Sequence, residues 1–264
     1  MSSSVSFYTF GNMAAATITA ITSEAAGFPK ENLLDFNPDT YWKPASTATQ
    51  TIDFDLGSAK TVDAVCGFLQ NYTLAGGYTA TKWYSDNGTN WTQDTGNCTW
   101  GNLGAGPLRI TSLSAPSSHR YWRLVLGIAA AQVPIFSGIW FARRYTISVG
   151  NQWPENDTER YFNRKVTASG GREFITRINR NKSMIIPRQY LFATSTPFLA
   201  LQNVFNDSAG DARPLIIQEG DTYDDAFLVS IESADFNQSK NGYQLYNPSL
   251  TFKQLPYIAS TETY

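Results

Sequence analysis

The chain has 264 residues, of which 42% are hydrophobic, 14% aromatic and only 16% charged, and its formal net charge is −2. This length is sufficient for two hydrophobic cores. The near-neutral charge excludes the strongly basic surface that binding to nucleic acid or to an anionic membrane would need. Many Thr, Ser, Asn and Gly residues separate short apolar runs, a composition typical of strands joined by turns.

The first 27 residues lack the features of a secretory signal. No basic residue precedes their apolar positions, and Thr, Ser or Glu interrupts every apolar run. No stretch of the chain resembles a membrane span. If the sequence is complete, we expect the protein to be made in the cytoplasm and to leave it by assembly or lysis.

Residues 27–42 read GFPKENLLDFNPDTYW. Pro29 suits the first turn of a short helix. Asp35, Asn37 and Asp39 are turn formers that bond their own backbone amides, so this loop can collect several oxygens. Trp42 then enters a strand, and we expect its indole to fill the end of a sandwich core.

Three later stretches follow in order: DLGSAKTVDAV at 55–65, YSDNGTNWT at 84–92 and RYWRLVL at 120–126. Together with the loop, they make the first 145 residues resemble the discoidin family, also called the coagulation-factor type C or galactose-binding-like domain. Asn87 stands where the family usually has an aspartate. The resemblance implies a jelly-roll β-sandwich that binds glycans or lipid head groups without catalysis. Its register predicts that Trp42, Trp91 and Trp122 are largely buried.

The resemblance also implies a calcium site. In discoidin-like glycan-binding modules the loop matching residues 34–40 often holds calcium, and here Asp35, Asn37, Asp39 and Thr40 would supply the oxygens. Those modules usually add a glutamate from the last strand, but Gly138 stands near its position. Two interpretations stay open: a weakened calcium site, or a loop held only by the hydrogen bonds of its acidic residues.

A ligand surface on this fold would come from loops at one end of the sandwich, where aromatic rings stack on sugars and amides bond their hydroxyls. The candidate loops are 71–78 and 97–104. Their ligand-binding residues are Trp100, Tyr72, Asn71 and Asn102. Trp100 is the favoured aromatic, because its Asn, Thr and Gly neighbours form no alternating apolar pattern that would bury it. The alternative is that these aromatics belong to a core or a subunit interface.

Catalytic patterns are lacking in the sequence. The single histidine, His119, precedes a predicted strand without the pattern of a catalytic triad, which favours a capping or surface role. No His/Cys cluster has zinc spacing, and no glycine-rich phosphate loop leads from a strand into a helix. Cys66 and Cys98 form either a disulfide or two buried thiols, and the apolar surroundings of Cys66 favour a small buried hydrophobe. The sequence therefore predicts a protein that is not an enzyme.

The polar, Pro-containing segment 152–159 indicates a domain boundary. We therefore expect a discoidin-like sandwich at 1–145, a connector at 146–160 and a second domain at 161–264. A Thr-Pro start and helical spacing predict a helix at 197–205. Alternating or β-branched runs predict strands at about 172–179, 182–192, 213–218, 225–232 and 242–253. The predicted fold is all-β, a galactose-binding-like jelly roll followed by a β-sandwich with one helix.

This order of strands and helix, closed by a Y-x-L … L-x-F-x-x-L pattern, is similar to the β-sandwich of bacteriophage distal-tail, tail-tube and related baseplate proteins. The resemblance implies a location in the virion tail and assembly with other tail proteins and with copies of itself. The first domain would then bind host-surface glycan or serve as an assembly surface. The alternatives are a free bacterial carbohydrate-binding module or adhesin, and an accessory fragment of a glycoside hydrolase.

Charges in the second domain are segregated along the sequence. The predicted subunit-contact residues are basic Arg177, Arg180, Lys182 and Arg188, and acidic Glu219, Asp221, Asp224 and Asp225. In a ring, sixfold if the tail resemblance holds, the basic edge of one subunit would meet the acidic loop of the next. The acidic loop is otherwise a solvated turn or, as a third alternative, a metal or catalytic site.

Overall fold

The computed structural model describes residues 3–70, 78–95, 98–99, 108–128, 133–150, 158–167, 173–185, 191–192, 196–209, 213–219, 226–236, 245–246 and 249–255. Within these ranges the protein is built from antiparallel strands with one α-helix, α1 (Thr196–Asp207). Two short 3-10 helices, η1 (Gly11–Met13) and η2 (Lys30–Leu33), are also present, and η2 follows Pro29 as the sequence predicts. The predicted all-β class with one helix is confirmed.

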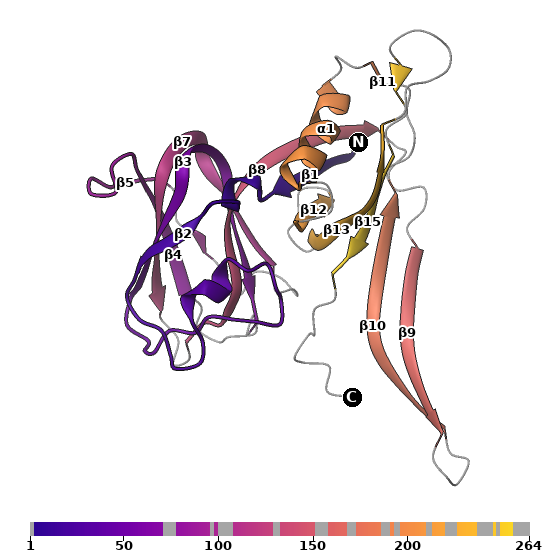
Figure 1. Cartoon of the computed structure of the whole chain (residues 1–264), viewed down its shortest axis with the longest axis horizontal. Coiled ribbons are helices and arrows are strands. Elements are labelled where there is room, and N and C mark those ends of the chain that lie inside the picture. Colours follow the sequence, from indigo (N-terminus) through magenta and orange to yellow (C-terminus); the bar gives the residue numbers. More distant parts are fainter. Residues whose placement is uncertain are drawn as a thin grey trace.

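The first unit is a folded ribbon of two long strands, β3 (Gln50–Leu69) and β7 (Leu108–Ile128). Their pairing is interrupted after Asp55, where Gly57 adopts a φ of 78° and the ribbon arches over (Figure 1). The part before the arch pairs with β2 (Thr17–Ile21), and the part after it pairs with β8 (Phe136–Gly150). The remaining strands of this unit are β4 (Tyr78–Ser85), β5 (Thr92–Gln93) and β6 (Cys98–Thr99).

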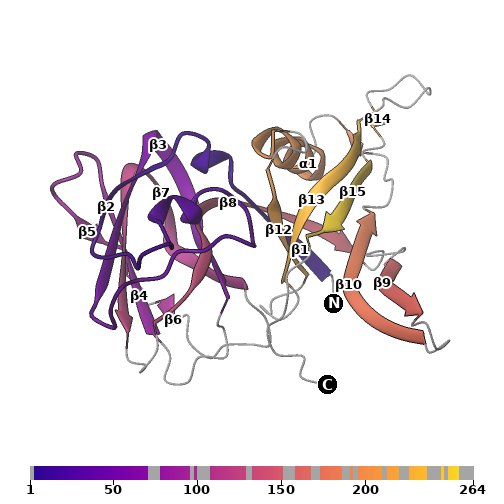
Figure 2. The same cartoon turned by 60° about the horizontal axis from the view of Figure 1, so that its bottom comes forward.

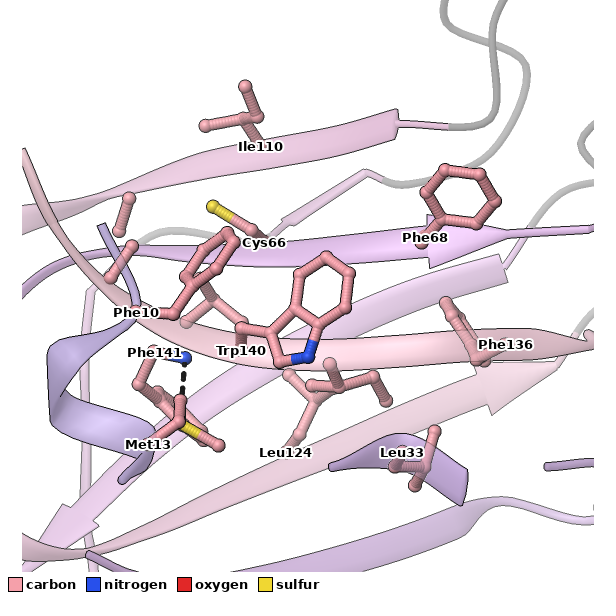
Figure 3. Packing of buried hydrophobic residues seen from close by; sticks show 14 of the residues in the cluster. Phe10, Met13, Leu33, Cys66, Phe68, Ile110, Leu124, Phe136, Trp140 and Phe141 are labelled. Atoms are coloured by element: carbon pink, nitrogen blue, oxygen red, sulfur yellow. Dashed lines mark hydrogen bonds between the residues drawn. The ribbon is translucent and has the colours of Figure 1, made fainter. Parts of the chain in front are cut away.

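Aromatic side chains fill the space inside the folded ribbon. Trp42 and Trp122 are completely buried, as predicted, and Figure 3 shows the neighbouring packing around Trp140 and Phe141. The prediction was wrong for Trp91, which is only half-buried. Its ring lies outside the core beneath the guanidinium of Arg123, 4.1 Å from the ring centroid. An indole in this position is held by a cation–π contact instead of by core packing.

The second unit is a sheet that the helix α1 covers. Its strand order begins with the second half of β8 and continues with β1 (Ser3–Thr9), β12 (Leu215–Glu219), β13 (Ala226–Asp235), β15 (Ser249–Gln254), β10 (Glu173–Ile185) and β9 (Thr158–Thr167). The buried residues of α1 include Phe198, Leu201 and Val204, as expected from its helical spacing. A separate pair, β11 (Leu191–Phe192) and β14 (Leu245–Tyr246), forms a small second sheet.

The two units share strands, a feature that the sequence analysis did not predict. β1, at the start of the chain, pairs with β12 and with the second half of β8 (Figure 2). β8 continues to Gly150 and β9 begins at Thr158, inside the span that we assigned to a connector. The predicted strands at 172–179 and 182–192 were also wrong in detail, because β10 runs unbroken from Glu173 to Ile185.

The end of α1 is tied to the junction between the units. The hydroxyls of Thr9 and Tyr145 both donate to Oδ2 of Asp207, at 2.9 and 2.8 Å. Burial and the neighbouring Asp207 raise the pKa of Tyr145, so its hydroxyl stays a donor. Gly11 packs against the same turn, since a Cβ there would lie 3.0 Å from the Asp207 carbonyl oxygen.

Candidate functional site

The ends of the sandwich strands gather at one end of the first unit, opposite the arch. Phe68 pairs with Leu108 and Leu69 with Phe136, so the end of β3 lies beside the starts of β7 and β8. On the other layer, the start of β4 pairs with the end of β7. These strand ends therefore lie together at one end of the sandwich (Figure 1). We call this region, with the loop 22–49, the loop end.

The loop that carries the discoidin-like motif is fastened to this end. Trp42 and Phe136 exchange two backbone hydrogen bonds, of 2.8 and 3.0 Å. Gln70 Nε2 and Ser137 Oγ both donate to the carbonyl oxygen of Pro38, at 2.6 and 3.0 Å. These contacts place residues 35–42 across the ends of β3 and β8.

The structure brings the predicted calcium residues together, but as a loop that bonds itself. Oδ1 of Asp35 accepts from the Asn37 amide at 2.9 Å, and Oδ1 of Asn37 accepts from the Asp39 amide at 3.0 Å. The Thr40 hydroxyl donates to the second Asp35 oxygen. These are the side-chain-to-backbone turns that Asp and Asn favour.

Two neighbouring positions explain why the loop differs from the calcium site that the resemblance implies. Phe36 adopts a φ of 55°, and its ring stacks on Phe10 and Trp140. A Cβ at Gly138 would lie 2.0 Å from the Trp140 indole, so this position has no room for a carboxylate. Among the described residues, no group of three or more His, Cys, Asp or Glu is arranged to hold a metal. The residues present do not fit the expected calcium site.

The four predicted ligand-binding residues, Asn71, Tyr72, Trp100 and Asn102, lie outside the described residues. The described residues that flank them do belong to the loop end. Gln70 precedes the first pair, and β6 precedes the second pair and is bonded to the start of β4. The structure thus describes the residues that precede these four in the chain, but not the contacts of the four residues themselves.

Sequence reasoning missed an aromatic pair in the same loop region. Phe28 and Tyr41 stack with ring centroids 5.0 Å apart, and both are half-buried. Lys43 Nζ lies 5.9 Å from the Phe28 centroid. The backbone around the pair is fixed, because Asn32 Nδ2 donates to the Tyr41 carbonyl oxygen at 2.9 Å. The two aromatics belong to one irregular loop in which no periodic spacing indicates a contact, so only the fold could reveal the pair.

The remaining candidates have structural contacts. His119 Nδ1 lies 2.8 Å from Asp86 Oδ1, and its ring stacks on Tyr84 with centroids 4.0 Å apart. These contacts agree with the surface role predicted for this histidine. Cys66 is a buried free thiol, and burial raises its pKa, which makes it a small hydrophobe as predicted. The side chain of Cys98 is outside the description.

The predicted subunit-contact residues are divided between the sheet and undescribed segments. Arg177, Arg180 and Lys182 lie on β10, and Glu219 ends β12. Arg188, Asp221, Asp224 and Asp225 lie outside the described residues, so their contact stays a prediction. In the described part of the chain, no helix has the length and apolar character that crossing a bilayer requires.

An antiparallel sandwich with its connections gathered at one end belongs to the class of β-sandwich modules that present binding loops on a rigid scaffold. Residues 17–132 match the family model of the F5/8 type C domain. This part of the chain is therefore a discoidin, or coagulation-factor type C, domain, as its four motifs predict.

Several solved structures are similar to about half of this chain. A family 32 carbohydrate-binding module of Clostridium perfringens NanJ, in complex with galactose, is 16% identical with a TM-score of 0.44, covering 52% of this chain and 99% of that one. The C-terminal domain of a Bacteroides fragilis chitobiase is 17% identical with a TM-score of 0.43, covering 52% and 97%. A Ruminococcus gnavus GH29 fucosidase in complex with fucose is 19% identical with a TM-score of 0.39, covering 51% and 26%. No curated protein matches the sequence.

Proposed function

We propose that the protein is a non-catalytic binding protein whose discoidin domain holds a carbohydrate at the loop end. One observation supports this most strongly: the described strands next to Tyr72 and Trp100 in the sequence end at the side of the sandwich that carries the stacked Phe28–Tyr41 pair. The family match over residues 17–132 agrees with such a role.

The proposed chemistry follows from the residue types. Aromatic rings offer flat apolar faces to the C–H groups of a sugar ring, while amide groups and a lysine bond its hydroxyls. The Phe28–Tyr41 pair is already ordered by the Asn32 bond and by the bond from the Ala25 amide to the Lys43 carbonyl oxygen. A surface ordered before binding loses less conformational entropy when the ligand binds.

The test is binding to a glycan array by the whole chain and by two variants. Trp100→Ala and Tyr41→Ala should each weaken binding at least about tenfold, equivalent to about 1.4 kcal/mol, without lowering the thermal unfolding temperature. Tyr121→Ala is the matched control, because Tyr121 lies near the arch and packs under Arg120. Unchanged binding by both loop-end variants would contradict the proposal. A Trp100→Ala variant that loses self-association instead would indicate an assembly contact.

We further propose that the chain is a component of a phage tail or other virion, made in the host cytoplasm, with other tail proteins as partners. The support is the second sheet, in which antiparallel strands carry one helix, as the sequence predicts for the tail-protein sandwich. Quantitative mass spectrometry of purified particles should find the chain in a fixed ratio to other tail proteins. Recovery only from bacterial envelopes or culture medium would favour the alternative, a free carbohydrate-binding module or adhesin.

A further inference from the structure

The hairpin of β9 and β10 extends beyond the sheet to which it belongs. The two strands pair with each other from Glu173–Thr167 to Ser183–Thr158. β10 pairs with β15 only through Ser183, Met184 and Ile185. In the described residues, the rest of β10 therefore pairs with β9 alone, and the hairpin projects past the end of β15 (Figure 1). We call residues 158–167 and 173–182 the arm.

The sequence of the arm is unsuited to standing alone in water. A two-stranded ribbon without further covering is at best marginally stable. In the backbone register Val166 is paired with Phe174 and the adjacent Lys165 with Ile175, and successive pairs of a hairpin belong to alternate faces. Apolar residues thus occur on both faces. A sheet or helix of the same unit would cover only one of them, so the pattern indicates a partner from outside.

The charge of the arm identifies the kind of partner. Six of the chain's 20 Lys and Arg residues fall in the arm, but only two of its 22 Asp and Glu residues do. The arm is therefore strongly basic, and the rest of the chain, with 14 basic and 20 acidic residues, is its electrostatic complement. Two arms carry the same sign of charge, and β9 carries Arg160, Arg164 and Lys165 on an edge strand, which opposes pairing of one arm with another.

We infer that the arm is a docking element that binds the body of a second copy of this chain, an inference that rests on the proposed assembly role and not on glycan binding. Because arm-to-arm pairing is disfavoured, the contact is heterologous: the arm of one copy meets a different surface of the next. Such a contact closes into a ring or continues as a filament, instead of stopping at a twofold dimer. Arg177, Arg180 and Lys182, predicted as contact residues, lie within the arm.

Sedimentation of the whole chain tests the inference. At about 0.05 M salt we expect species larger than dimers, and at about 1 M salt, where the Debye length is about 3 Å, a shift toward monomers. Arg160→Glu combined with Arg164→Glu should give monomers at both salt concentrations. Lys43→Glu combined with Lys60→Glu, which changes the same charge in the first unit, should leave assembly intact. Circular dichroism and glycan binding of the arm variant check that it folds and that the first unit works.

A variant in which a short turn replaces residues 160–180 tests the heterologous geometry. It lacks the arm but keeps the surface that an arm would bind, so adding it to the whole chain should cap assemblies and reduce their mean size. No reduction in size would overturn the heterologous contact. A whole chain that is monomeric at every salt concentration would overturn the inference, as would a monomer whose arm binds anionic vesicles or nucleic acid. Glycan binding that persists in such a monomer would leave the proposed carbohydrate role standing.

Discussion

A buried ion pair gives the sharpest prediction about stability. Lys82 lies on β4 and Asp94 just after β5, and their side chains are only 1% and 5% exposed. Lys82 Nζ lies 3.0 Å from Asp94 Oδ2 and donates to the Ser112 carbonyl oxygen at 3.0 Å. The Ser114 hydroxyl donates to Asp94. The pair therefore fastens the β4–β5 hairpin to β7.

Removing one partner should destabilise the sandwich far more than removing both. Lys82→Met keeps most of the volume but leaves the Asp94 carboxylate buried without a cation, which costs about 3–5 kcal/mol. In Lys82→Met/Asp94→Leu the buried charge is gone. What remains is the loss of hydrogen bonds to Ser112 and Ser114, at about 1 kcal/mol each. We therefore expect the double variant to be more stable than Lys82→Met alone.

Urea unfolding followed by tryptophan fluorescence measures this difference. Six of the chain's seven tryptophans precede residue 145, so the signal reports mainly on the first unit. The control is Arg143→Met, which breaks a surface pair with Asp63 whose arginine is 36% exposed, and should cost at most about 1 kcal/mol. A Lys82→Met variant that loses less than about 1 kcal/mol, or a double variant less stable than it, would refute the reasoning.

Three further outcomes are expected. Trp122→Ala should lower the free energy of unfolding by about 3–5 kcal/mol and the half-buried Trp91→Ala by clearly less, in the same urea assay; equal losses would contradict the assigned packing. The Arg120 guanidinium holds the pKa of Asp55 below its usual value of 3.8. The ionised carboxylate therefore adds to the free energy of unfolding at pH values above 3.8, and this contribution is lost as the pH falls through the lower pKa of the folded state. Asp55→Asn should therefore show a smaller fall in melting temperature between about pH 6 and about pH 3. Calcium in place of a chelator should leave the melting temperature unchanged, because the loop 34–40 is closed by its own hydrogen bonds; a rise would show that the loop does hold the ion.

The sequence was most informative where local chemistry decides the structure. Pro29 preceding a short helix, Asp35 and Asn37 capping their own loop, and Trp42 entering the core all follow from the preferences of single residues or short motifs. Trp91 shows the limit of this reasoning. Its motif position indicates that an aromatic is needed, but whether the ring enters the core depends on its contact with Arg123, which is distant in the sequence.

Pairing between distant strands was beyond the sequence analysis. The apolar alternation of β1 indicates a strand, but it has no signal for a partner more than 200 residues away in β12. The aromatic pair Phe28–Tyr41 was missed for a different reason: both residues lie in one irregular loop, where no periodic spacing indicates which side chains meet. Gly138 stands where the resemblance implies an acid, but the sequence does not show that the Trp140 indole on the same strand fills the space a side chain there would need.

The shared strands determine how the two units act together. β8 pairs with β3 through its first half and with β1 through its second half, so continuous backbone hydrogen bonding replaces a linker. The Asp207 carboxylate also accepts hydrogen bonds from the hydroxyls of Thr9 on β1 and Tyr145 on β8. A join of this kind resists bending, because movement would break ladder hydrogen bonds as well as the buried contacts of Asp207. Whatever binds the arm of the second unit therefore also sets the direction in which the loop end of the first unit faces.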